Sequence, residues 1–391
     1  MRNEIDARTR REIVAGGAAV GGALVAGCVS GTEQAGESDR DESNTDAGDE
    51  SYTVSMEPMG EVTFESVPER WMAYFSTYGD MGIALGQLDG LEALIFAENW
   101  PDQFYETVPG LGVDLGDVDQ LMGDSGIDKE TFYELDCDVH LFDRNFIARL
   151  DDSWDDDDFD EIDSAVGPIF GNLIRRRGEE WHDYTYYSLY EAFEKIADVF
   201  QERARYGAIK AIHDEFVGTI ETGLPPENER PEIGLFSINS DFDGGSFYAY
   251  PIVGGNEHKH LRDLGIRDAF DQHIDGTHTE WDYEQLLEVD PDVLVFSFGF
   301  SHATAAEFDD RMAALRDHPV GSKLAAVRND RLYRGGTAYQ GPIINLIQTE
   351  IAAKQFYPDV FGEWNGVEAL AEDDEQLFDH RRIGEIVGGS I

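Results

Sequence analysis

The sequence predicts an α/β protein with two lobes, each built on a mostly parallel sheet, and one long helix between them. Strand-like and helix-like segments alternate in the first part of the chain and again in its last part. Such alternation is typical of parallel sheets covered by helices on both faces. The two series are separated by residues 187–221, in which apolar side chains recur at helical spacing.

The first series predicts a lobe over residues 52–186. Its opening segment, YTVSMEPMGEVTFESVP, alternates apolar and polar residues and predicts two strands around a Pro-Met-Gly turn. A loop through Tyr78 and a helix capped by Asp80 are expected next. Further along, ELDCDVHLF predicts a strand in which Cys137 is a small buried side chain. The other predicted elements are strands at 71–75 and 91–96 and a helix at 129–135.

The second series predicts a lobe over residues 222–391, with a helical extension at its C-terminal end. In the helical stretch before it, Gly207 is expected to mark a kink or a break between two helices. The proline-rich segment ETGLPPENERPE ends that stretch. The predicted elements of the second lobe are strands at 233–238 and 293–298, a helix at 283–288, the strand in RLYRGG and the helix in GPIINLIQTEIAAKQFYP.

The charge of the chain excludes whole classes of protein. With 29 basic and 81 acidic residues among 391, the formal net charge is −52. A nucleic-acid binder is excluded because phosphates would be repelled at moderate salt. A disordered acidic chain is excluded by the 23 Phe, 16 Tyr and 6 Trp residues. Acidity spread over the whole chain is typical of proteins that work in concentrated salt, so we expect an extreme halophile as the source.

The N-terminus, residues 1–28, predicts an export leader. TRR resembles a twin-arginine signal, the apolar stretch after it is too short for a membrane span, and VAGC resembles a lipobox. We therefore expect cleavage before Cys28, a lipid on its thiol, and anchoring to the outer face of the cytoplasmic membrane. The alternative is a chance Ala/Gly helix with an unrelated cysteine. Residues 29–51 predict a flexible acidic tether.

Several segments resemble one known family in order and spacing. PERWMAYFSTYGDMGIALGQLDGLEAL is similar to its opening strand, ligand loop and helix, and FYELDCDVHLFD and YEQLLEVDPDVLVFS to its helix-then-strand pairs. AVRNDRLYRGG and GPIINLIQTEIAAKQFYPDVFG are similar to its last strand and helix, and EQLFDHRRIGEIVGG to an extension of some archaeal members. Over residues 60–391 the chain thus resembles the substrate-binding lipoproteins of ABC importers for ferric siderophores, cobalamin and related metal complexes. It departs from the family at Cys137, where a Pro-Asp pair is usual, and this affects only a turn.

The resemblance implies two lobes that close only slightly around a rigid helix, with the ligand in the cleft between them. Ligands of open α/β sheets bind beyond the carboxyl ends of the strands, so the loops of both lobes supply the candidates. Aromatic rings suit planar catechol or corrin-like ligands, and arginine suits an anionic complex. The candidate ligand-binding residues are Tyr78, Asn99, Trp100, Arg144, Asn145, Trp181, Phe242, Tyr248, Phe300, His302 and Tyr339.

Some of these candidates have a structural alternative. Arg144 is the leading candidate, but it could instead pair with a neighbouring acid. The basic segment IRRRGEEWHDY could reach the cleft or form ion pairs within itself, and its Trp181 could line a pocket or fill a core. In the family, one acidic residue on the outer face of each lobe pairs with the permease, and Glu106 and Glu257 are the counterparts by position.

No resident metal site is predicted. The histidines are expected on the surface, because nothing brings three or four ligands together at a fixed geometry. These histidines are His258, His260, His273 and His278. DDSWDDDDFDEID, residues 151–163, lacks the glycine and the terminal glutamate of a calcium loop and predicts a solvated surface loop.

The resemblance implies a binding protein that captures an iron complex, with a ferric siderophore as the first candidate. Cobalamin, haem or another metal species is the alternative on the same fold. A secreted hydrolase is the distant alternative, and against it the sequence has no Gly-x-Ser-x-Gly, His-Glu-x-x-His or phosphate-loop motif. The expected partners are an ABC permease with its ATPase, the small metal chelate and, through lipidated Cys28, the membrane. Neither nucleic acid nor a tightly bound cofactor is expected, and the protein is expected to be a monomer.

Overall fold

The computed structural model describes residues 51–177, 180–372 and 376–391. The predicted leader, Cys28 and nearly all of the tether therefore lie outside the described residues.

The N-terminal lobe is built on a parallel sheet in the order β5-β4-β3-β8. The central strand β3 is buried on both faces, as expected for a parallel sheet with helices around it. An antiparallel hairpin, β1–β2, precedes this sheet as predicted. The elements of this lobe are β1 (Tyr52–Met56), β2 (Gly60–Phe64), β3 (Trp71–Ala73), α1 (Ser76–Ala84), β4 (Leu91–Leu94), α2 (Asp102–Tyr105), β5 (Asp119–Gln120), β6 (Met122–Gly123), β7 (Gly126–Ile127), α3 (Lys129–Leu135), β8 (Val139–Leu141), α4 (Arg144–Leu150) and α5 (Asp156–Ala165).

Two helices, α6 (Leu189–Val199) and α7 (Arg203–Gly223), connect the lobes. The helical stretch expected between the lobes is thus present, but it is not one continuous helix. The break lies before α7, where Gln201 adopts a left-handed φ of +54°, and Gly207 lies inside α7. With 21 residues, α7 is about 31 Å long at 1.5 Å per residue.

The C-terminal lobe has a mixed sheet in the order β12-β10-β9-β13-β14, with β11 paired to β9. Strands β9, β13 and β14 run parallel, whereas β10 and β12 form an antiparallel edge. The elements of this lobe are β9 (Glu232–Ser237), β10 (Phe247–Tyr250), α8 (Lys259–Asp263), β11 (Arg267–Asp268), β12 (Thr279–Trp281), α9 (Tyr283–Val289), β13 (Val293–Ser297), α10 (Gly299–His302), α11 (Ala305–Asp317), α12 (Ala325–Arg328) and β14 (Leu332–Arg334).

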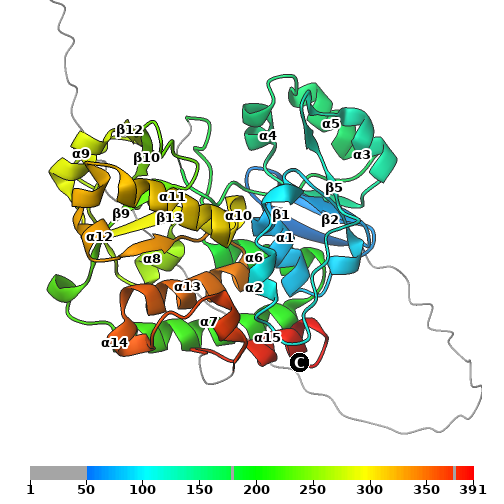
Figure 1. Cartoon of the computed structure of the whole chain (residues 1–391). Coiled ribbons are helices and arrows are strands. Elements are labelled where there is room, and N and C mark those ends of the chain that lie inside the picture. The colour runs from blue at the N-terminus through cyan, green and yellow to red at the C-terminus, as the bar shows by residue number, and fades with distance from the viewer. Residues whose placement is uncertain (1–50, 178–179, 373–375) are drawn as a thin grey trace, which may run out of the picture. The chain divides into compact units, whose positions relative to one another are not determined.

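A helical layer closes the fold beneath both lobes. It contains α13 (Pro342–Phe356), α14 (Pro358–Phe361) and α15 (His380–Val387) together with α7 (Figure 1). Every residue of α13 is buried, and α13 contacts α1 and α6 as well as α7 and α8. One core cluster accordingly runs from the N-terminal sheet through α6, α7 and α13 into the C-terminal sheet. The lobes therefore share a continuous apolar base rather than meeting only through a linker.

Asp80 fastens α1 to this layer. Its side chain is fully buried, and its Oδ2 accepts the backbone N–H groups of Ile343 (2.8 Å) and Ile344 (3.0 Å) in the first turn of α13. Its Oδ1 accepts the hydroxyl of Tyr105 at 2.6 Å. The prediction that Asp80 starts and caps its own helix is wrong, because α1 begins at Ser76 and Asp80 caps α13 instead.

Two further predictions are corrected by the fold. Residues 156–165 of the acidic segment form α5 rather than a loop, because Asp155 and Asp158 make a reciprocal capping box at its N-terminus. His258 and His260 are buried, not on the surface, because both belong to the turn and helix packed against α13. The prediction for Cys137 is confirmed, since its side chain is free and buried.

Candidate ligand-binding cleft

The carboxyl ends of the parallel strands in the two lobes face the same space. The segments after β3, β4 and β8 approach it from one lobe, and those after β13 and β14 from the other. In open α/β sheets such loops are where ligands bind. The side chains that meet in this space are therefore the candidates for ligand binding.

Tyr339, in the segment after β14, lies at the centre of the junction. Its ring stacks on Phe75 of the N-terminal lobe, with ring centroids 3.7 Å apart and planes inclined by 7°. The hydroxyl of Ser76 donates to the Tyr339 carbonyl oxygen at 2.6 Å. The ring centroid of Phe298, in the C-terminal lobe, lies 5.9 Å from that of Tyr339. Arg175 Nη1 donates to the Tyr339 hydroxyl at 2.8 Å, and its guanidinium lies over the ring at 4.7 Å. Tyr339 thus joins both lobes and holds one arginine.

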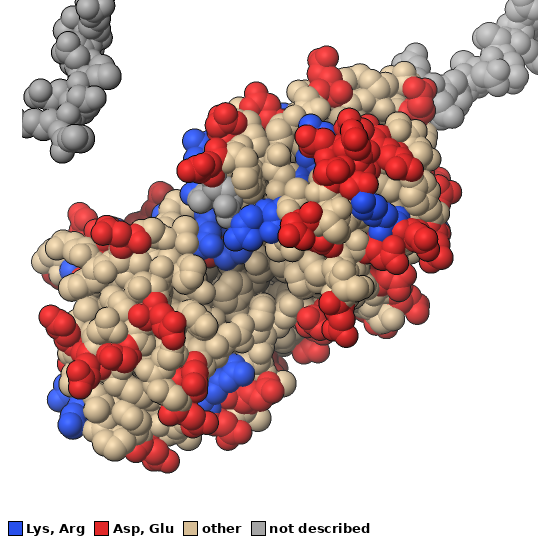
Figure 2. Space-filling view, turned by 90° about the horizontal axis from the view of Figure 1, so that it is seen from above, with Lys and Arg blue, Asp and Glu red and all other residues tan. Residues whose placement is uncertain are grey.

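A cavity of about 220 Å³ lies beside Tyr339 and is lined by three arginines. Its lining residues are Phe146, Arg149, Leu150, Leu173, Arg175, Arg176 and Tyr339. Figure 2 shows basic side chains gathered beside the hollow in the middle of this face, while acidic side chains dominate the charged groups around them. In a chain with a net charge of −52, such a group of arginines creates a local site for anions.

Glu257 does not line this cavity but pairs with two of its arginines. Its Oε1 accepts from Arg175 Nη2 at 2.9 Å, and its Oε2 lies 3.4 Å from Arg176 Nη1. Burial alone would raise the pKa of the Glu257 carboxyl, but Arg175, His258 and Arg176 together lower it to about 2. Burial likewise opposes the charge on Arg175, yet Glu257 and the neighbouring tyrosines raise its pKa above the usual value. The pair is therefore ionised at neutral pH.

The adjoining part of the junction holds a second cavity of about 420 Å³. It is lined by Glu98, Asn99 and Gln103 from one lobe and by Phe300, Ser301, His302, Ala303, Thr304, Glu307 and Arg334 from the other. Gln103 Nε2 donates to the Phe300 carbonyl oxygen at 2.6 Å, so the lobes touch here too. Arg334 is engaged within its own lobe, because its guanidinium lies 4.5 Å from the centre of the Phe300 ring and donates to Gly299.

Four of the eleven candidate ligand-binding residues line these two cavities. They are Asn99, Phe300, His302 and Tyr339. Burial lowers the pKa of His302, so its imidazole is neutral at neutral pH. Phe300 is nearly buried and packs against Phe104, so its face toward the ligand space is small.

Three candidates belong to the cores of the lobes instead. Tyr78 lies in α1 rather than in a loop, and its hydroxyl donates to the Asn172 carbonyl oxygen at 2.7 Å. Trp100 is buried and stacks on Tyr105. Phe242 is buried in the core cluster of the C-terminal lobe. Their aromatic rings are used for packing, which a loop position in the sequence does not reveal.

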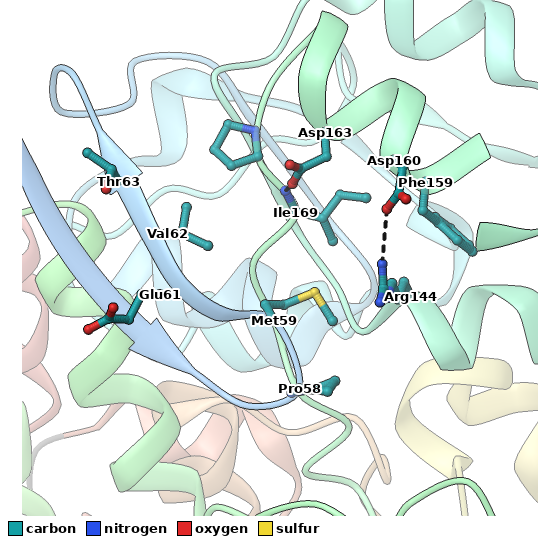
Figure 3. Close-up of a pocket in the computed structure, with 11 residues that line it drawn as sticks. Pro58, Met59, Glu61, Val62, Thr63, Arg144, Phe159, Asp160, Asp163 and Ile169 are labelled. Carbon is teal, nitrogen blue, oxygen red and sulfur yellow. Dashed lines mark hydrogen bonds and ion pairs between the residues drawn. The ribbon is translucent and has the colours of Figure 1, made fainter. Parts of the chain in front are cut away.

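Arg144, the leading candidate, lies outside the cleft. It lines a groove between the β1–β2 hairpin and α5, where its Nη1 lies 3.3 Å from Asp160 (Figure 3). This groove shares no lining residue with the two cleft cavities. The alternative weighed for Arg144, pairing with a neighbouring acid, is what the structure shows. The next residue, Asn145, donates to Asp143 at 3.1 Å.

The last two candidates line neither cleft cavity. Tyr248 is exposed on β10 of the antiparallel edge. Trp181 is half-buried and stacks on His182, with centroids 5.7 Å apart, against the core of the N-terminal lobe.

The two docking candidates differ in exposure. Glu106 is exposed at the end of α2, as a docking residue requires. Glu257 is only 2% exposed and is paired with Arg175, so it cannot present its carboxylate to a partner protein. The expectation of a docking role for Glu257 is therefore wrong.

The sequence analysis missed most of the arginine-lined cavity. Phe75, Phe146 and Arg149 were not selected, and Arg175 and Arg176 were noted only as part of a basic segment. The signal in the sequence that could have identified them is the basic segment IRRRGEEWHDY, which was expected to be able to reach the predicted cleft. Both Arg175 and Arg176 pair with Glu257, which lies more than 80 residues further along the chain.

The described part of the chain has neither a cluster of metal ligands nor a helix suited to span a membrane. Among residues 51–177, 180–372 and 376–391, no three His, Cys, Asp or Glu side chains are grouped so that they could hold a metal ion. Within the same residues, no helix combines the length and the hydropathy required to cross a bilayer.

Comparisons with known proteins agree on the fold. Residues 154–339 match the family model described as periplasmic binding protein. None of the curated proteins matches the chain in sequence. A periplasmic binding protein from Veillonella parvula has a TM-score of 0.56 and 14% identity over 78% of this chain and 97% of its own. An iron uptake ABC transporter substrate-binding protein from Streptococcus pneumoniae has a TM-score of 0.55 and 15% identity over 78% and 97%.

A third similar structure comes from an ABC-type Fe³⁺-hydroxamate transport system of Saccharomonospora viridis, with a TM-score of 0.51 and 20% identity over 76% of this chain and 96% of its own. At these identities the structures establish the fold. The matched family consists of binding components of transport systems, which are not enzymes. The described chain therefore has the two-lobed α/β fold of periplasmic binding proteins, and its residues 154–339 carry the sequence pattern of that family.

Proposed function

We propose that this protein is the substrate-binding component of an ABC importer and that its cargo is an anionic iron complex, a ferric siderophore. The observation that carries the proposal is the cavity between the lobes, which combines three arginines with the aromatic rings of Phe146 and Tyr339. Guanidinium groups and aromatic faces together suit aryl-bearing anionic chelates. Two proteins with the same fold, one from an Fe³⁺-hydroxamate transport system and one from an iron uptake transporter, support this cargo.

The ligand-contacting groups in this proposal are Arg149, Arg175, Arg176, Tyr339 and Phe146, with His302 and Asn99 at the second cavity. A cavity of about 220 Å³ holds part of a siderophore rather than all of it, so the cargo extends into the adjoining space. Cobalamin or haem on the same fold remains the second candidate cargo, because both also present large flat rings to aromatic side chains.

Delivery completes the proposal. After export, a lipid on Cys28 would hold the protein at the outer face of the cytoplasmic membrane, with residues 29–51 as the tether. The exposed carboxylate of Glu106 is the proposed docking group on the N-terminal lobe for an arginine of the permease. The protein would act as a monomer and hand its cargo to that permease.

Titration of the full chain with ferric siderophores, their iron-free forms, cobalamin and haem tests the cargo. We expect quenching of tryptophan fluorescence by a ferric siderophore at low micromolar concentration or below. Arg176→Gln should weaken that binding about tenfold, because it removes a charge-assisted contact worth about 1.5–3 kcal/mol. Arg144→Gln is the matched control, since the same change in the separate groove should leave the affinity unchanged. Binding of cobalamin or haem alone would overturn the siderophore assignment.

A further inference from the structure

Two of the arginines that line the 220 Å³ cavity pair with a carboxylate that does not itself line it. This carboxylate belongs to Glu257, which is 2% exposed and forms ion pairs with Arg175 and Arg176. The side chains of these two arginines are 14% and 23% exposed, so Arg176 is the more exposed of the two.

Glu257 is held in place by contacts beyond its two arginines. Its backbone N–H donates to the Arg175 carbonyl oxygen at 2.9 Å, and its own carbonyl oxygen accepts from Gln340 Nε2 at 3.2 Å. The neighbouring His258 imidazole lies 3.9 Å from the Glu257 carboxylate, and burial lowers the pKa of His258 to about 4, so it adds no positive charge at neutral pH. The carboxylate is thus rigidly placed, and only arginine charges oppose it.

One oxygen of the Glu257 carboxylate, Oε2, is buried and has no hydrogen-bond partner among the described residues. The nearest cation is Arg176, whose Nη1 lies 3.4 Å from Oε2 and forms an ion pair with it. Buried carboxylate oxygens are normally hydrogen-bonded, because leaving one unpaired is costly. A carboxylate retained at this cost, next to two cavity-lining cations, indicates a role other than packing.

We propose that Glu257 is a specificity-determining residue that sets which charge class of chelate the cleft accepts. It acts through Arg175 and Arg176, by cancelling one of the two positive charges that these side chains bring to the cavity. Glu257, Arg175 and Arg176 together then carry a net charge of +1, so anionic chelates are preferred but the preference for the most highly charged ones is limited. This inference rests on the proposed function, since it assigns the charge class of the cargo of that same site.

The test compares two ferric complexes of different charge on the full chain, a trianionic tris-catecholate and a neutral tris-hydroxamate, by tryptophan fluorescence. In Glu257→Gln the affinity ratio of trianion to neutral complex should rise by about tenfold or more, because one unit of opposing charge is removed close to the ligand. Arg176→Gln, a change at the more exposed of the two arginines paired with Glu257, should lower the ratio by a similar factor. Glu257→Asp retains the charge and should retain the wild-type ratio. A merely structural role would weaken the binding of both complexes equally and leave the ratio unchanged, and that result overturns the inference.

A second pair of probes separates this inference from the proposed function. Failure of the wild-type chain to bind either iron complex would count against the siderophore cargo. The charge comparison then uses phthalate and phthalamide, a dianion and a neutral molecule of the same shape, by thermal shift. The wild-type chain should prefer phthalate, and Glu257→Gln should increase that preference. Absence of any preference for phthalate, or no change of it in Glu257→Gln, overturns the charge-setting role.

Discussion

At the scale of single residues, Asp80 joins parts of the chain that are more than 260 residues apart. Its carboxylate in α1 accepts the first-turn N–H groups of Ile343 and Ile344, which the helix itself leaves without partners. Such a cap usually comes from the residue just before the helix, but that position is Gly341, which has no side chain. A Cβ on Gly341 would lie 2.5 Å from Asp80, so the glycine is what allows α1 to approach.

The buried Asp80 carboxyl predicts a pH-dependent stability. Burial raises its pKa from 3.8 to about 7, although the hydrogen bonds from Tyr105, Ile344 and Ile343 oppose that rise. Because the folded state binds the proton more tightly than the unfolded state, the stabilising contribution is complete below about pH 4 and is lost as the pH rises through about 7. Relative to Asp80→Asn, the free energy of unfolding of the wild type should fall by up to about 4 kcal/mol over this range.

Chemical denaturation at a series of pH values measures this difference. The charged or titratable side chains that face Asp80 are the hydroxyls of Tyr105 and Tyr190, which do not titrate in that range. Asp157→Asn makes the same chemical change at an exposed position of α5 and serves as the control. Parallel pH profiles for the wild type and Asp80→Asn would show that Asp80 does not titrate with an elevated pKa.

At the scale of elements, the periodic parts of the chain could be predicted, and the contacts between elements could not. Short apolar runs indicated β9 and β13, and longer helix-like segments indicated α3 and α13, because the length and composition of an apolar segment are local properties of the sequence. The helix α5 was missed because its aspartates were interpreted by composition, whereas their spacing forms a capping box. The arginine-lined cavity was missed because Glu257 and Tyr339, which position Arg175, lie far from it in sequence.

The position of the break between α6 and α7 gives a prediction for Gly207. Gly207 lies inside α7, and a Cβ placed there would meet no atom within 4 Å. Gly207→Ala should therefore raise the free energy of unfolding by about 1 kcal/mol, the difference in helix propensity between the two residues. Thermal or urea unfolding measures the change.

Gly82 provides the matched control for that prediction. It also lies inside a helix, α1, but a Cβ there would fall 2.3 Å from a ring atom of Trp71. Gly82→Ala should consequently lower the free energy of unfolding by about 1–3 kcal/mol through overpacking. A destabilising Gly207→Ala would place the helix break at Gly207 rather than before α7.

At the scale of the whole described chain, the two lobes are held by more than a connecting segment. The core cluster runs through α6, α7 and α13 into both sheets, Asp80 caps a helix across the junction, and Phe75 stacks on Tyr339 above them. Proteins that close by hinge bending absorb the motion in a few loop or element-terminal residues between otherwise independent domains. Here a hinge would have to break a shared apolar core, so ligand binding should change side chains in the cleft more than the orientation of the lobes.

Distance measurements between spin labels test this rigidity. Tyr133 in the N-terminal lobe and Tyr248 in the C-terminal lobe are 44% and 40% exposed, so both can be replaced by labelled cysteines. Cys28→Ser in the same chain removes one of the two natural cysteines. The other, Cys137, is buried and therefore protected from labelling. Addition of a chelate that the protein binds should change the distance between the two labels by less than about 3 Å. Loop and side-chain adjustments are of that size, whereas hinge closures are larger. A shift of about 10 Å would show that the shared core opens on binding, and the cleft would then have to be described as two separate half-sites that meet around the ligand.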